Sequence, residues 1–206
     1  RKEIVKAFDV SLILYAEHSF NVSTFTARTI TSSLSDIHGA ITGAIASLKG
    51  PLHGGANEEV MHMMNKIKKP ENALKWINNA LNKKEVVMGF GHRVYKKGDS
   101  RVPTMEKYFK KVSLIKGDKK FIKIYDIVKK VMINRKNIHP NVDYPTGPTY
   151  HLMGFDTDFF TPIFVISRIT GWAAHIMEQH AANKLIRPLS KYKGQKYRKV
   201  MSLNYR

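Results

Sequence analysis

The sequence contains no cysteine, which excludes disulfide bridges, thiolate metal sites and a cysteine nucleophile. No apolar run approaches the roughly 18 residues that span a bilayer, so we expect no membrane insertion. Acidic residues are scarce, since 35 Lys and Arg stand against 16 Asp and Glu, giving a formal net charge of +19. Such a surface attracts anions such as nucleic acid, phosphorylated cofactors or carboxylate substrates, although a lysine-rich proteome would produce the same excess.

Strand signals are also scarce. The chain has no sustained alternation of apolar and polar residues, no Asn-Gly hairpin and no long-period repeat. Its 206 residues are 43% hydrophobic and 25% charged, a globular composition that suits one or two domains. We therefore predict an all-α fold.

Apolar and small residues recur at helical spacing along most of the chain, with breaks at polar residues, glycine and proline. The predicted helices cover 7–17, two segments within 23–48 that separate near Ser35 and Asp36, a segment from about Asn57, 71–81, and a basic pair within 103–136. Three prolines between Asn137 and Pro148 predict a loop.

The C-terminal part of the chain carries one more helix signal. Thr161 followed by Pro162 is typical of a helix start, with the hydroxyl as N-cap and proline at the first helical position. An apolar stripe then follows at helical spacing, formed by Val165, Ile169, Trp172 and Ile176. Beyond Leu185 the chain becomes polar and basic, which predicts an extended tail.

His53 lies in a glycine-rich turn, within Gly-Pro-Leu-His-Gly-Gly-Ala-Asn-Glu at residues 50–58. Glycines on both sides allow the backbone to approach a ligand closely. The positive end of the helix that should follow favours a neutral imidazole. A neutral ring can donate a hydrogen bond to a developing enolate oxygen, although a lone histidine is more often a surface or core residue.

His92 lies in a second glycine-rich loop, together with Arg93 and Arg101. The third glycine of a dinucleotide-binding fingerprint is missing, so the loop suits an anionic ligand of another kind. A basic surface turn is the alternative interpretation.

Three further residues each allow two interpretations. His18 follows an apolar helix, where it is either functional or a helix C-terminal cap. Arg168 flanks the apolar stripe, so it must either form a structural salt bridge or bind an anion. Asp143 lies in the proline-rich segment, where an acid is either functional or forms a turn with its own side chain.

Other functional motifs are missing. The spacing of His175, Glu178 and His180 is not that of a zinc protease helix, and we expect no metal site. The chain has no nucleophile elbow and no phosphate-binding Walker loop. The basic segment from Lys107 to Lys136 contains aromatic residues that a nucleic-acid surface could use, but a solvated helix face explains it more simply.

Four segments, in this order, resemble the citrate synthase family across essentially the whole chain. They are the residues 50–58, the Gly-x-Gly-His and Asp-Ser-Arg elements of 89–101, Pro-Asn-Val-Asp at 140–143, and the segment 160–188. The resemblance implies an enzyme, an acyltransferase that condenses acetyl-CoA or propionyl-CoA with oxaloacetate and releases citrate or 2-methylcitrate and CoA. It implies no cofactor, because acyl-CoA is a substrate.

The resemblance also implies roles for single residues. Asp143 is the base that removes a proton from the acyl-CoA α-carbon, His53 stabilises the enol or enolate, and His92 polarises the ketone of oxaloacetate. The residues that hold oxaloacetate are His18, Arg101, Arg168, Phe164 and Arg187, the last contributed by the neighbouring subunit of a homodimer. Gly89, Phe90 and Gly91 form an acyl-CoA loop.

Carried over from the family, residues 1–54 and 155–206 belong to a large domain, and 55–154 form a small domain. The N-terminal part of the large domain is missing from this match, which corresponds to the C-terminal half of the family's chain. Residues 144–148 and the ending at 187–190 resemble the branch that contains 2-methylcitrate synthases, but the acyl chain stays open.

The positive charge leaves two further questions open. It favours, as an alternative function, a citrate synthase-like structural subunit whose basic surface docks into a filament, a membrane complex or a ribonucleoprotein. It also favours the mitochondrial matrix as the location, with the bacterial cytoplasm as the alternative.

Overall fold

The computed structural model describes residues 2–95 and 97–205. Within them the chain forms helices and no strand, apart from an isolated bridge between Phe90 and Pro140, which confirms the all-α prediction. The helices are α1 (Lys2–Tyr15), α2 (Val22–Ser32), α3 (Ile37–Leu48), α4 (Ala56–Ile67), α5 (Pro70–Asn82), α6 (Val102–Lys116), α7 (Lys120–Lys136), α8 (Asp143–Met153), the short 3-10 turn η1 (Thr157–Phe159), α9 (Phe160–Ala181) and η2 (Leu203–Tyr205).

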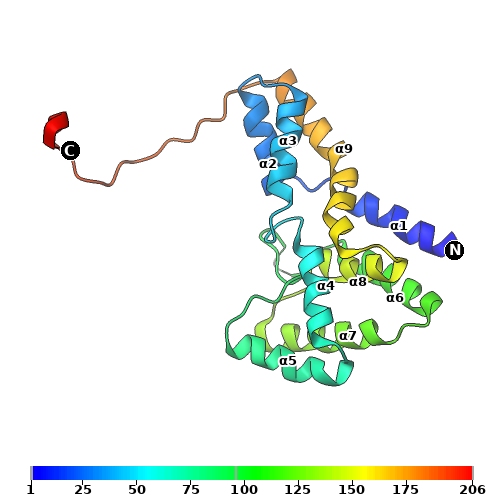
Figure 1. The fold of residues 1–206 in the computed structure, drawn as a ribbon. Coiled ribbons are helices and arrows are strands. Elements are labelled where there is room, and N and C mark those ends of the chain that lie inside the picture. Colours follow the sequence, from blue (N-terminus) through cyan, green and yellow to red (C-terminus); the bar gives the residue numbers. More distant parts are fainter. Residues whose placement is uncertain (1, 96, 206) are drawn as a thin grey trace.

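The helices form two groups (Figure 1). Helices α2, α3 and α9 pack against one another, and α4 to α8 form a second group beneath them. Helix α1 joins the groups, because it packs against both α6 and α9. No helix in the described parts of the chain has the length and apolar character needed to cross a membrane.

The predicted break between two helices in 23–48 is confirmed. Helix α2 ends at Ser32, and the Asp36 carboxylate starts α3 by accepting the Gly39 N–H at 2.8 Å. The N-cap of α2 is Asn21, whose side-chain oxygen accepts the Thr24 N–H at 3.1 Å. These short polar side chains satisfy N–H groups that have no partner inside the helix.

The predicted loop over 137–148 is wrong from Asp143 onward, because Asp143 is the first residue of α8. Pro145 lies in the first turn, where its missing N–H would have had no partner in the helix. Pro148 does cost one backbone hydrogen bond, and tight packing compensates. A Cβ on Gly147 would lie 2.7 Å from the Asn57 carbonyl oxygen, so α8 lies directly against α4. The base candidate therefore starts a buried helix rather than lying in a loop.

The predicted N-cap of the last helix is also wrong. Helix α9 begins at Phe160, because η1 runs directly into it and leaves no extended residue to act as a side-chain cap. The Thr161 hydroxyl has no partner among the described residues, whereas its backbone N–H donates to the Glu58 carboxylate at 3.0 Å. A carboxylate from α4 thus caps α9 from outside its own sequence.

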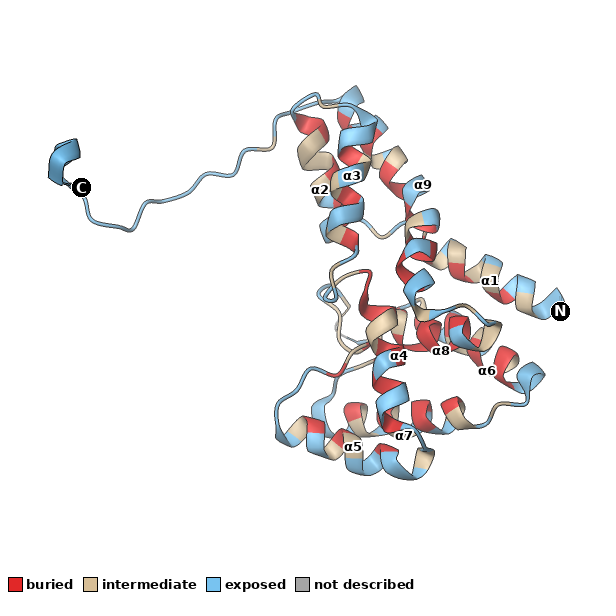
Figure 2. Cartoon of the chain, in the orientation of Figure 1, coloured by how far each residue is buried: buried red, intermediate tan, exposed pale blue. Residues whose placement is uncertain are grey.

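The buried face of α9 also differs from the predicted stripe. Trp172 and Ile176 are buried as expected, but Ile169 is 41% exposed. The inner face passes instead through Phe164 and Arg168, both less than 6% exposed. Figure 2 shows this burial along α9, and it shows the extended, exposed tail that was predicted beyond Leu185.

Candidate active site

Connections and helix ends from both helix groups converge on one region. His18 follows α1, His53 lies in the turn before α4, and His92 lies between α5 and α6. Arg101 immediately precedes α6, Asp143 starts α8, and α9 supplies Phe164 and Arg168. The contacts described below join these residues into one cluster.

His53 is held from α2. The Ser23 backbone N–H donates to Nε2 of His53 at 3.2 Å, and the Ser23 hydroxyl lies 2.9 Å from the same nitrogen. A backbone N–H only donates, so Nε2 is unprotonated and the proton of the neutral ring lies on Nδ1. Burial, reinforced by the nearby Arg168 guanidinium, lowers the pKa of His53 to about 4. The neutral ring predicted from the helix start thus also follows from burial and from the cationic Arg168.

His92 and His18 meet across the site. Nδ1 of His92 accepts backbone N–H groups of Val94 and Tyr95 at 3.1 and 3.3 Å, which leaves the proton of the neutral ring on Nε2. That nitrogen lies 3.1 Å from Nε2 of His18, so His92 donates and His18 accepts. Burial, with Arg101 and His92, lowers the pKa of His18 to about 4, and burial also lowers that of His92. His18 does not cap α1, because the helix ends at Tyr15.

Arg101 is fixed by Asp99. The buried carboxylate accepts hydrogen bonds from Nε and Nη2 of Arg101 at 3.0 and 2.7 Å. It also accepts one from the Val142 backbone N–H at 3.1 Å. Burial acts to raise the pKa of Asp99, but these bonds to Arg101 hold it below its usual range. The pair therefore stays charged. Through Asp99 it also connects Arg101 to Val142, the residue that precedes Asp143.

Arg168 forms no ion pair with any described carboxylate, so the salt-bridge interpretation fails. Its side chain is 1% exposed, its Nε donates to the Tyr15 carbonyl, and its guanidinium lies 4.8 Å from the centre of the Phe164 ring. Nη1 is buried with no partner among the described residues. Burial and the charge of Arg101 lower the pKa of Arg168 to about 10. An unpaired buried guanidinium requires an anion.

Asp143 accepts a hydrogen bond from the Tyr15 hydroxyl on Oδ1 at 2.6 Å. Its backbone N–H donates to the Asn141 side-chain oxygen at 3.1 Å, and no described residue donates to Oδ2. Burial raises the pKa of Asp143 to about 6, against the opposing effects of Tyr15 and Arg101. The carboxyl is therefore ionised at neutral pH, yet it is a stronger base than an ordinary aspartate.

The loop of Gly89, Phe90 and Gly91 lies against the chain just before Asp143. Gly91 N–H donates to the His139 carbonyl at 2.8 Å, and Asn141 N–H donates to the Gly89 carbonyl at 2.9 Å. Gly89 has a φ of +81°, and a Cβ there would lie 2.7 Å from Val60. Both facts require glycine at this position.

Arg187 is not part of this cluster. It lies in the exposed tail, where its Nη1 donates to the Pro188 carbonyl at 3.4 Å. The tail extends away from both helix groups (Figure 1), so a role for Arg187 in this chain's own site has no geometric support.

Several residues of the site carry no distinctive sequence signal. Tyr15 and Ser23 orient Asp143 and His53, but each occurs in an ordinary helical or polar context. Asn141, which holds the backbone of Asp143, lies within the Pro-Asn-Val-Asp segment but was not predicted to have this role. Asp99 precedes Arg101 by two positions, in a Gly-Asp-Ser-Arg run that could have suggested a local ion pair.

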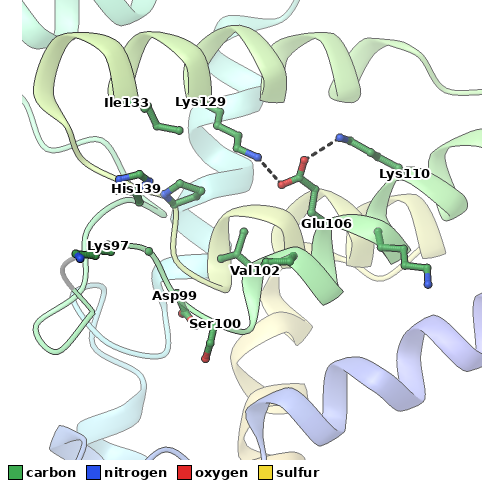
Figure 3. Close-up of a pocket in the computed structure, with 13 residues that line it drawn as sticks. Lys97, Asp99, Ser100, Val102, Glu106, Lys110, Lys129, Ile133 and His139 are labelled. Atoms are coloured by element: carbon green, nitrogen blue, oxygen red, sulfur yellow. Dashed lines mark hydrogen bonds and ion pairs between the residues drawn. The ribbon is translucent and has the colours of Figure 1, made fainter.

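A cavity of about 750 Å³ adjoins the site (Figure 3). Asp99 forms part of its wall, and Lys110 and Lys129 both bond to Glu106 at 2.8 and 2.6 Å. Lys97 and Lys107 line it as well, and neither forms an ion pair with a described carboxylate. This positive lining raises the local concentration of anions beside the cluster.

The arrangement suits one kind of chemistry. It combines a carboxylate base, three neutral histidines with assigned protons, and arginines whose charge is incompletely balanced. These groups can remove a carbon-bound proton, stabilise the resulting oxyanion by hydrogen bonds and hold a substrate with carboxylate groups.

Comparison with known proteins gives consistent matches. The family model described as citrate synthase, C-terminal domain, matches residues 1–189. The chain is 59% identical to 2-methylcitrate synthase 2 of Corynebacterium glutamicum, covering 98% of this chain and 53% of that protein. It is 56% identical to a citrate synthase of Mycolicibacterium smegmatis, covering 96% of this chain and 53% of that protein.

A solved structure matches as well. The ternary complex of carboxymethyl coenzyme A and oxaloacetate with the citrate synthase of Thermoplasma acidophilum superimposes with a TM-score of 0.91 at 38% identity, covering 100% of this chain and 56% of that one. The chain thus spans about half the length of the relatives it matches. Both curated relatives are bacterial, so the expected mitochondrial location has no support.

Proposed function

The chain belongs to the citrate synthase family, and we propose that the complete protein condenses acetyl-CoA or propionyl-CoA with oxaloacetate. The products are citrate or 2-methylcitrate and free CoA. The observation that carries this proposal is Arg168, a buried guanidinium that pairs with no carboxylate of the described residues and lies in one cluster with the base candidate Asp143.

Oxaloacetate binding balances the positive charge of the cluster. One carboxylate pairs with Arg168, whose Nη1 bonds to none of the described residues, and Arg101 and His18 complete the binding site. Phe164 packs against this site, and Arg168 lies over its ring. Charge-assisted hydrogen bonds in a buried site are stronger than those at the surface, so these contacts favour a dianionic ketoacid.

The acyl-CoA is activated by proton transfer. Oδ2 of Asp143 removes a proton from the α-carbon, and the Nδ1–H of His53 donates to the thioester oxygen as the enolate forms. Because the pKa of His53 is lowered to about 4, the ring stays neutral and donates a hydrogen bond without first losing a proton.

Carbon–carbon bond formation follows at the ketone of oxaloacetate. The Nε2–H of His92 exchanges its acceptor, from His18 to the ketone oxygen. It then stabilises the alkoxide that develops as the enolate carbon attacks. Hydrolysis of the thioester then releases CoA. No step needs a cofactor or a metal ion.

The wider assembly is part of the same proposal. Residues 1–54 and 155–206 belong to the large domain, 55–154 form the small domain, and their closure excludes water before the enolate forms. The protein acts as a homodimer in which the exposed Arg187 reaches the neighbouring site. The bacterial relatives favour the bacterial cytoplasm.

Release of thiol from acetyl-CoA and from propionyl-CoA, each with oxaloacetate, tests the proposal in the complete protein. Release that depends on oxaloacetate supports it, and the ratio of kcat/KM for the two thioesters identifies the preferred acyl chain. If a folded dimer releases no thiol from either substrate, the catalytic proposal is wrong and the structural-subunit alternative gains support.

A further inference from the structure

Tyr15 connects α1 to the base candidate. Its hydroxyl donates to Oδ1 of Asp143 at 2.6 Å, although the two residues are 128 positions apart in the chain. The side chain is fully buried, and its ring lies 4.0 Å from that of Phe164, centre to centre. As the last residue of α1, Tyr15 also offers a carbonyl without a partner inside the helix, which accepts Nε of Arg168.

These contacts fix the phenol in place from both ends. Its hydroxyl cannot leave Asp143 without moving the ring against Phe164 or breaking the bond between its carbonyl and Arg168. Helix α1 is packed against α6 and α9, so the backbone that carries Tyr15 is itself held.

We propose that Tyr15 is a positioning residue for the proposed condensation: it holds Oδ1 of Asp143 and leaves Oδ2 to take the substrate proton. A carboxylate rotates about its last side-chain bond with two similar preferred orientations, so one fixed oxygen sets the direction of the other. The backbone of Asp143 is held by Asn141 at 3.1 Å, and the tyrosine supplies the second anchor. The inference rests on the proposed function, because it assigns Asp143 the role of base.

The same hydrogen bond influences the protonation of Asp143. Donation to the ionised form favours that form, so the Tyr15 hydroxyl keeps the pKa of Asp143 from rising above about 6. The other charged groups that act on this carboxyl are Arg101 and Asp99 from the loop before α6, and Arg168 from α9. Replacing Tyr15 by phenylalanine leaves those groups in place and removes the phenolic donor alone.

The experiment compares pH profiles of the complete dimeric enzyme. In Tyr15→Phe, the acidic limb of kcat/KM moves upward by about one pH unit, because Asp143 loses a donor to its ionised form. At alkaline pH, where Asp143 is ionised in both proteins, kcat falls about tenfold or more because the base is poorly aimed. The KM for oxaloacetate changes little. A structural role alone would lower thermal stability without moving the limb.

Tyr150→Phe is the matched control. Tyr150 is an equally buried tyrosine of α8 whose hydroxyl lies 2.9 Å from that of Ser11 and bonds to no carboxylate of the described chain. Its variant loses one buried hydroxyl of the same kind and keeps the acidic limb of the parent enzyme.

The outcomes separate this inference from the proposed function. If the parent enzyme releases no thiol, or Asp143→Asn keeps activity within a few-fold, the proposed function or its base is wrong and the inference falls with it. If Asp143→Asn is inactive but Tyr15→Phe keeps both the limb and kcat, the inference alone is wrong.

A second variant decides the case in which Tyr15→Phe does not fold. A fluorinated tyrosine introduced at position 15 keeps the ring and is a stronger donor, so the acidic limb moves downward, opposite to the phenylalanine variant. An unmoved limb in this nearly isosteric protein would overturn the inference.

Discussion

Arg168→Met separates a binding arginine from a structural one. Methionine keeps much of the length of the side chain and removes the charge. The parent guanidinium is 1% exposed, and its pKa is lowered to about 10, mainly by burial. Each pH unit by which a pKa is displaced corresponds to about 1.4 kcal/mol, so the buried charge destabilises the ligand-free fold by about 3 kcal/mol.

The substitution also removes favourable contacts. The Tyr15 carbonyl loses its Nε donor, which costs about 1–3 kcal/mol, and the contact of the guanidinium with the Phe164 ring contributes about 1 kcal/mol. The gains and losses nearly cancel. We expect the free energy of unfolding to change by less than about 2 kcal/mol, whereas breaking a buried salt bridge would cost about 3–5 kcal/mol.

The effect on ligand binding is expected to be large. At a concentration of oxaloacetate 100 times its Kd, binding stabilises the parent protein by about 2.7 kcal/mol. Loss of a buried charge contact costs about 2–5 kcal/mol of binding, so a Kd raised about 100-fold leaves roughly 0.4 kcal/mol at the same concentration.

Chemical denaturation with and without oxaloacetate measures both effects. Arg28→Met is the control, since Arg28 pairs with Glu178 on the outer part of α9, and its loss should preserve the stabilisation by ligand. If Arg168→Met instead loses more than about 3 kcal/mol while the ligand effect persists, Arg168 is a structural residue and the reasoning is wrong.

Three further predictions follow from the fold and the site. Glu58→Gln weakens the cap on the Thr161 N–H and lowers the free energy of unfolding by about 0.5–2 kcal/mol in urea denaturation; no change would mean that solvent caps α9 equally well. The pKa of His53 is lowered to about 4 in the folded chain. Between about pH 6.5 and 4 the unfolded chain therefore binds a proton at His53 and the folded chain does not. Stability therefore falls as the pH drops from about 6.5 toward 4, and His53→Gln should flatten this dependence; an equal slope in both proteins would contradict the assignment. Arg187→Ala abolishes activity, and mixed dimers with a His53-defective chain recover part of it, unless the arginine acts within its own subunit.

The helical character of the fold follows from local patterns in the sequence. The break between α2 and α3 was predictable because Asp36 caps its own helix within four residues. The missed start of α8 had a different cause. Prolines at 145 and 148 argue locally for a loop, but the packing of α8 against α4 at Gly147 outweighs that local preference.

The ionisable groups of the candidate site were also predictable from local motifs, because the glycine-rich and Pro-Asn-Val-Asp segments carry His53, His92, Arg101 and Asp143. The hydrogen bonds and pKa values of those groups depend instead on how the helices pack together. The contact between Tyr15 and Asp143 joins residues 128 positions apart. Several helices together likewise bury His53, which lowers its pKa, and bury Nη1 of Arg168, which has no partner among the described residues. Hydrogen bonding and desolvation depend on the atoms that surround a group in space, so neighbours in the chain do not reveal them.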